Sequence, residues 1–234
     1  MIYSPSNRFL LVQNIKVGGT SLKLELAKNL PMDSYVTYSG SGPIGTNLSI
    51  EDDRDIIDKL NHYKNFMEMS FSEPILTHIS YTNIKNKFPN EDWEKVTSCV
   101  FVRNPYSTVL SHFFMTLQFE YLVHKFLTYP KKYQDVVVDN YFNSHHQMLS
   151  TKPIYTDENK NILVNHVFKY ENGLESEINK ILPLVGLPTI DSIKYSAKKF
   201  KPSDITYKDV FSERHLDIIQ KEWAWEFEEF KYDR

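Results

Sequence analysis

Residues 9–21 of the chain read FLLVQNIKVGGTS, and this stretch decides which fold we expect. The apolar run FLLVQNI is typical of a strand, and KVGGTS is a turn that contains a glycine pair. Leu22, Leu26 and Leu30 then recur at the spacing of one helical face. The segment therefore predicts a strand, a glycine loop and a helix, in that order.

The same alternation of strands and helices continues along the chain. Further strands are expected at Pro74–Ile79, Val96–Val102 and Ile162–Phe168, and each is followed by a helical pattern. Strands that alternate with helices predict a mostly parallel sheet covered on both faces. The sequence thus predicts the α/β class, as a single three-layer domain over residues 1–234 with a P-loop-like strand, loop and helix.

Local signals place several helix starts. Asn104 is expected to cap a helix whose first residue is Pro105, and Ser49 to cap a helix over residues 51–66. A final amphipathic helix is predicted over residues 212–225. The glycine-rich residues 38–50 predict a mobile surface loop.

Composition narrows the possible partners. The 27 basic and 30 acidic residues give a net charge of −3, so we expect neither nucleic acid nor an anionic membrane as a partner. Cys99 is the one cysteine, which excludes an intrachain disulfide and favours a buried thiol in a reducing compartment. No apolar run approaches the ~20 residues that cross a bilayer. We therefore expect a soluble, cytoplasmic protein.

Cationic side chains follow two of the predicted strands. Lys16 comes after the first strand and Arg103 after the third, at the carboxyl ends where open parallel sheets bind ligands. The loop around Lys16 offers backbone N–H groups at a helix N-terminus, which suits an anion. The Walker pattern would place the lysine after the glycines, and a magnesium-dependent kinase would have an acid near Arg103. These departures argue against an ordinary kinase.

Several segments resemble the PAPS-dependent sulfotransferases, which use 3′-phosphoadenosine 5′-phosphosulfate as sulfuryl donor. FLLVQNIKVGGTSL looks like their 5′-phosphosulfate-binding strand and loop, and CVFVRNPYSTVLSHF looks like their 3′-phosphate-binding strand and helix. LTHISY (76–81) is similar to the histidine segment of the uronyl and heparan 2-O-sulfotransferases, although Thr77 replaces a glycine. FKYENGLESEINKIL and the terminal WAWEFEEFKY extend the resemblance to this carbohydrate branch.

The resemblance implies a role for each matching residue. The 5′-phosphosulfate would be held by Lys16, Gly18, Gly19, Thr20 and Ser21. The 3′-phosphate would be held by Arg103 with Ser111, and by Lys201 in a late basic loop that covers the nucleotide. His78 would be the base that takes the acceptor proton, and Lys16 would stabilise the leaving phosphate. The implied reaction is in-line sulfuryl transfer from PAPS to a hydroxyl of a carbohydrate or small molecule, without a metal.

Alternatives stay open at this level. His112, His145 and Glu73 compete with His78 as the base, and the aromatic residues between 118 and 150 face either a cleft or the core. A metal site is not expected, because the histidines lack a ligand spacing such as H-E-x-x-H. The rival functions are a P-loop-like small-molecule kinase and a catalytically inactive nucleotide-binding domain. The sequence does not fix the acceptor or the oligomeric state.

Overall fold

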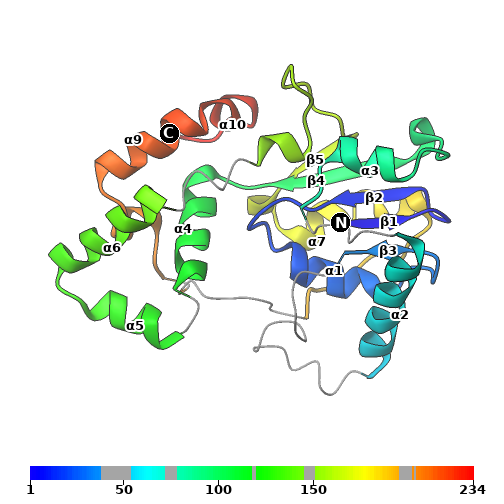
Figure 1. Ribbon diagram of the computed structural model, residues 1–234, viewed down its shortest axis with the longest axis horizontal. Coiled ribbons are helices and arrows are strands. Elements are labelled where there is room, and N and C mark those ends of the chain that lie inside the picture. The colour runs from blue at the N-terminus through cyan, green and yellow to red at the C-terminus, as the bar shows by residue number, and fades with distance from the viewer. Residues whose placement is uncertain (38–53, 72–77, 118–119, 145–150, 195–201, 203) are drawn as a thin grey trace. The chain divides into compact units, whose positions relative to one another are not determined.

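The structure is a computed structural model in which the chain forms two compact units (Figure 1). It describes residues 1–37, 54–71, 78–117, 120–144, 151–194, 202 and 204–234. The first unit combines Met1–Val102 with Thr151–Ala197, and the second combines Arg103–Ser150 with Lys198–Arg234. The prediction of one domain over residues 1–234 stays a prediction.

The first unit contains a five-stranded sheet with the order β3-β1-β2-β4-β5. The strands are β1 (Ile2–Ser4), β2 (Phe9–Val12), β3 (Tyr35–Val36), β4 (Thr97–Val102) and β5 (His166–Lys169). β4 pairs in parallel with β2 and with β5, whereas β1 is antiparallel to β2 and to β3. The α/β class is confirmed, but the prediction of a mostly parallel sheet is wrong because the sheet is mixed.

The turn between β1 and β2 explains the mixed sheet. Residues 5–8 form this turn, in which the Arg8 N–H donates to the Pro5 carbonyl at 3.0 Å. A connection this short can only return the chain antiparallel, because a parallel pair needs a crossover of a dozen or more residues. β1 and β3 have three and two residues, so neither is long enough to give a recognisable alternation in the sequence.

Helices pack on the sheet of the first unit. They are α1 (Gly19–Ala27), α2 (Arg54–Ser70), α3 (Tyr81–Lys87) and α7 (Leu174–Ile178), with short 3-10 turns at Trp93–Lys95, Lys152–Ile154, Tyr170–Asn172 and Leu182–Val185. α1 and α7 lie on the face where Leu11, Phe101 and Phe168 join the main hydrophobic core (Figure 1). Tyr81 of α3 hydrogen-bonds to Ser98. Along β4 the side chain of Ser98 points to the face opposite that of Phe101.

Most predicted strands are confirmed in part. β2 and β4 lie within the first and third predicted strands, and β5 overlaps the end of the fourth. Pro74–Thr77 lie outside the described residues, as does the predicted loop 38–50 with Ser49, and Ile79 is not in a strand. The three-layer arrangement stays a prediction. Cys99 is fully buried as predicted, and burial raises the pKa of its thiol.

The second unit is helical in its described residues. Its helices are α4 (Pro105–Thr116), α5 (Glu120–Thr128), α6 (Lys131–Ser144), α8 (Tyr207–Val210), α9 (Glu213–Glu222) and α10 (Ala224–Glu229). Asn104 caps α4 by accepting the Ser107 N–H, and Pro105 is the first helical residue, as predicted. Phe113, Phe126 and Tyr141 are buried against one another, so these aromatic side chains pack in the core.

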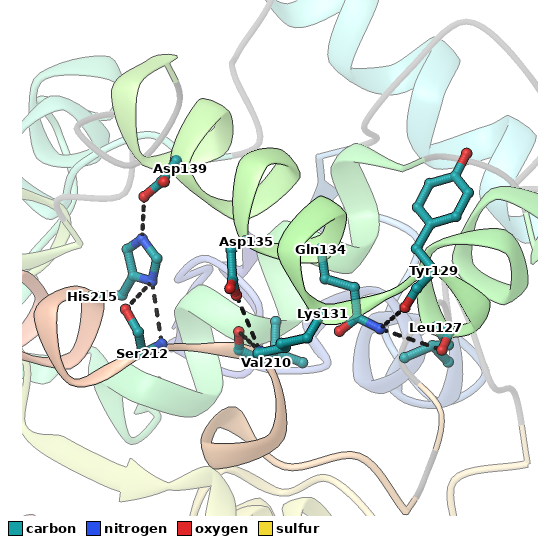
Figure 2. A network of polar contacts seen from close by, with 9 residues as sticks. All are labelled: Leu127, Tyr129, Lys131, Gln134, Asp135, Asp139, Val210, Ser212 and His215. Carbon is teal, nitrogen blue, oxygen red and sulfur yellow. Dashed lines mark hydrogen bonds and ion pairs between the residues drawn. The ribbon is translucent and has the colours of Figure 1, made fainter.

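α6 holds the second unit together through polar contacts (Figure 2). Gln134 donates to the Tyr129 carbonyl at 2.9 Å, which ties α6 to the end of α5. Lys131 forms an ion pair with Asp135 at 3.3 Å and donates to the Val210 carbonyl at the end of α8. Asp139 accepts from the ring of His215 at 2.8 Å, which ties α6 to α9.

Candidate functional site

The turn that follows β2 is fixed at its start by a buried asparagine. Asn14 is 3% exposed, and its side-chain amide donates to the Phe101 carbonyl of β4 at 3.1 Å. The side-chain oxygen of Asn14 accepts a hydrogen bond from the Ile15 N–H at 2.7 Å. The loop 16–21 therefore begins from a point anchored to the neighbouring parallel strand, at the carboxyl end of both strands.

The backbone of the loop is left-handed at two residues. Lys16 has a φ of +58°, and Gly18 has a φ of +69° immediately before the first residue of α1. A left-handed residue followed by a helical one turns successive N–H groups toward the same side and forms a concave nest for an anion. Because Gly18 has no side chain, it cannot cap the first turn of α1 as Asn or Ser would.

Both glycines are also closely packed. A Cβ on Gly18 would lie 2.8 Å from Leu174 Cδ1, and a Cβ on Gly19 would lie 3.2 Å from Gln13 Cγ. No acidic side chain lies in the first turn of α1. The positive end of the helix dipole is therefore not neutralised by its own first turn, which favours a bound anion.

The loop itself has three polar side chains. Lys16, Thr20 and Ser21 are half-buried, so each has a side chain between the core and the solvent. The lysine contributes a positive charge and the hydroxyl groups contribute donors. The described fold thus places all five residues of the predicted phosphosulfate loop on one turn and the first turn of α1.

His78 lies beside the same strand end. Its Nδ1 is 3.0 Å from the main-chain oxygen of Gln13, the first residue after β2. A carbonyl oxygen can only accept a hydrogen bond, so Nδ1 carries the hydrogen in this contact. In the neutral ring the proton-accepting nitrogen is then Nε2. His78 itself is exposed, which allows a substrate to approach its ring.

The structure therefore brings together His78 and the loop 16–21, through Gln13. Arg103 and Ser111 belong to the second unit, where both are half-buried: Arg103 precedes the cap of α4, and Ser111 lies within that helix. Lys201 lies outside the described residues, as do Lys198 and Lys199. Lys208, which follows these three lysines in the chain, is exposed on α8.

The alternative bases differ in their surroundings. In the second unit His112 Nδ1 lies 2.9 Å from the hydroxyl of Tyr141, and burial raises the pKa of that phenol. His145 and Glu73 lie outside the described residues. His166 stacks on Phe168 within β5, and in the part of the chain that is described no group of three His, Cys, Asp or Glu side chains could hold a metal.

Two polar residues of the site escape the sequence patterns. Gln13 and Asn14 fall at the end of an apolar run, where we expected only the continuation of a strand. Both are nearly fully buried, at 7% and 3% exposure. Polar residues directly before a glycine turn are the available signal, but their partners Phe101 and His78 are distant in the sequence.

Comparisons of the chain with protein-family models, curated proteins and solved structures find no match. Among the described residues, no helix has both the length and the apolar character needed to cross a membrane. The functional argument therefore depends on the residues of the site and on their chemistry.

Proposed function

We propose that the chain is a PAPS-dependent sulfotransferase that acts on the hydroxyl group of a carbohydrate or small molecule. The contact between His78 Nδ1 and the Gln13 carbonyl is the observation that supports this proposal most, because Gln13 precedes Lys16 by three residues in the chain. A cationic, glycine-containing turn and a histidine at one strand end are the two components that sulfuryl transfer needs.

The loop 16–21 is proposed to act as a P-loop-like anion site. It would bind the 5′-phosphosulfate through Lys16, through the N–H groups of Gly18 and Gly19, and through the hydroxyl groups of Thr20 and Ser21. When bound, PAPS supplies the sulfuryl group. Lys16 and the loop N–H groups stabilise the negative charge that develops on the departing phosphate, more strongly in the transition state than in the ground state.

His78 is proposed to remove the acceptor proton. The acceptor oxygen forms a new bond to sulfur while the bond between sulfur and the bridging phosphate oxygen breaks, and the electron pair of that bond stays on the phosphate. The acceptor proton moves to His78 Nε2, the nitrogen that its contact with Gln13 leaves as the proton acceptor. The Nδ1–H bond to a carbonyl also stabilises the ring once it is positively charged.

Arg103, Ser111 and Lys201 are proposed to bind the 3′-phosphate. A guanidinium group suits this role because its planar donors match phosphate oxygens in a bidentate manner. Arg103 directly follows Val102, the last residue of the central strand β4. The three-layer α/β arrangement is part of the same proposal.

Calorimetric titration tests the nucleotide specificity. We expect 3′,5′-adenosine bisphosphate to bind in EDTA, and ATP with Mg²⁺ to bind much more weakly. Lys16→Ala should reduce the bisphosphate affinity, whereas Lys95→Ala should not, because Lys95 forms an exposed ion pair with Asp92 before the amino end of β4. Preference for ATP with Mg²⁺ would support the kinase alternative instead.

Transfer of labelled sulfate from PAPS to a panel of sugar and small-molecule hydroxyls tests the activity. Labelled product with the wild type, and its loss in His78→Ala with retained bisphosphate binding, is the expected result. Bisphosphate binding with no transfer to any acceptor would support an inactive nucleotide-binding domain.

A further inference from the structure

Gln13 contacts three different parts of the first unit. Its main-chain oxygen lies 3.0 Å from His78 Nδ1, and its side chain lies against Gly19, where an added Cβ would be 3.2 Å from Cγ and 3.3 Å from Nε2. Its side-chain oxygen accepts from the Met1 amino group at 3.4 Å. At 7% exposure, this side chain is buried between Met1 and the first turn of α1.

We infer that Gln13 is a positioning residue, which sets the tautomer of His78 and its spacing from the loop 16–21. The direction of the Gln13 carbonyl depends on the plane of one peptide group, and the buried side chain of the same residue restrains that plane. The carbonyl in turn selects the Nδ1–H form of His78. The effect on tautomer follows from the contacts themselves, whereas its effect on catalysis rests on the proposed sulfotransferase function.

Close packing explains why the side chain matters. Gly19 is in contact with Gln13 from the side of α1, so crowding at residue 19 is transmitted to Gln13 and from there to His78. A distance of 3.2 Å between Cβ and Cγ is shorter than an ordinary van der Waals contact, so Gly19→Ala must move the glutamine. Removing the glutamine side chain provides the missing space.

Nitrogen NMR of the His78 ring tests the tautomer without any enzymatic assay. In the wild type at alkaline pH we expect Nδ1 to show the shift of a protonated ring nitrogen and Nε2 that of an unprotonated one. Gln13→Ala should give a mixture of both tautomers. Gln134→Ala is the matched control, because it removes a glutamine whose side chain donates to carbonyls of the second unit, at Leu127 and Tyr129.

Steady-state kinetics tests whether Gln13 sets the spacing between His78 and the loop 16–21. We expect Gln13→Ala and Gly19→Ala each to lower kcat about tenfold at saturating PAPS, since misplacement of about 1 Å costs up to 10²-fold. The double variant should be no slower than Gln13→Ala alone, because the Cβ at residue 19 no longer meets a glutamine side chain. Affinity for 3′,5′-adenosine bisphosphate should be unchanged in Gln13→Ala, and Gln13→Glu, which keeps the shape of the side chain, should recover most of kcat.

Different results contradict different parts of the argument. An unchanged His78 tautomer in Gln13→Ala would overturn the positioning role whatever the activity. Additive losses in the double variant, or loss of bisphosphate affinity in Gln13→Ala, would also overturn it, because Gln13 would then act independently or as a ligand. Absence of sulfate transfer in the wild type would remove the proposed function, while the tautomer result would still decide the structural role.

Discussion

His78 and His215 show how neighbouring groups give the same side chain opposite tasks. His78 is exposed and faces a carbonyl oxygen through Nδ1, so its hydrogen lies on Nδ1. His215 is 3% exposed, and its Nδ1 accepts the Ser212 N–H at 3.2 Å while Nε2 donates to Asp139 at 2.8 Å (Figure 2). His78 therefore has its hydrogen on Nδ1, whereas His215 has its hydrogen on Nε2.

The same contrast holds for the helix starts next to these histidines. α9 begins after Ser212, whose side chain and that of His215 form a reciprocal cap. α1 begins after Gly18, which has no side chain. A capped start stabilises its own helix, while a start without a side chain leaves the first N–H groups for a ligand. The comparison teaches that the start of α9 is stabilised by its own side chains, whereas the start of α1 has the open geometry that the proposed anion site requires.

The largest expected effect separates the two histidines by activity. His78→Ala should lower the rate of sulfate transfer about 10²- to 10⁴-fold, because it removes the general base. Thermal unfolding should change little, since the ring is exposed. The measurement is a transfer assay at saturating PAPS beside a thermal melt. A large loss of stability with normal transfer would assign His78 a purely structural role.

The second prediction concerns His215, for which we expect a large loss of stability and little change in transfer rate. His215→Ala should lower the free energy of unfolding by about 2–4 kcal/mol, since it removes a buried ring and its hydrogen bonds. The ring also stacks on Phe142 with a centroid distance of 4.6 Å, so a cavity is left. Urea unfolding measures this loss. Transfer assayed below the unfolding temperature should stay near the wild-type rate, and a selective loss of transfer would contradict the assignment.

The third prediction compares two left-handed glycines. Gly18→Ala and Gly186→Ala should each cost about 1–2 kcal/mol for the unfavourable backbone conformation. Gly18→Ala should cost more and should weaken bisphosphate binding, because its Cβ would lie 2.8 Å from Leu174. At Gly186 the nearest atom would lie 3.7 Å away, on Asn7. Equal stability losses with unchanged binding would remove the special role of Gly18.

The smallest expected effect concerns the cap of α9. Ser212→Ala should destabilise the protein by about 1 kcal/mol, because the side-chain oxygen no longer accepts from the first turn. His215 should keep its tautomer, since its Nε2 still donates to the Asp139 carboxylate. Chemical unfolding and nitrogen NMR measure the two outcomes, with exposed Ser144→Ala as the control. A changed tautomer would show that the Ser212 hydroxyl group, and not Asp139, holds the ring.

Local signals account for the parts of the fold that were predicted well. The central strand β4 and the Asn104–Pro105 start of α4 depend on neighbouring residues, so the sequence pattern contains them. β1 and β3 were missed because their stability comes from pairing across the sheet and not from their own two or three residues. The helical pattern expected after the fourth predicted strand is present as α7, which ends at Ile178 and is followed by a 3-10 turn at Leu182–Val185.

The candidate site divides along the same line. The glycines and the lysine of the loop 16–21 are close together in the chain, so a shared role in anion binding could be predicted from composition and order alone, and it stays a prediction. The partner of His78 could not, because Gln13 is 65 residues away and a contact through a main-chain oxygen has no sequence pattern of its own. The predicted role of Lys201 depends on a residue outside the described part of the chain.

The amino-acid sequence by itself determined the α/β class and the buried cysteine, because strand and helix periodicity and hydrophobicity are local properties. The tertiary structure alone decided the direction of β1, the tautomers of His78 and His215, and the close contact between Gly19 and Gln13. These depend on hydrogen bonds and packing between segments far apart in the chain, whose partners only the folded backbone selects.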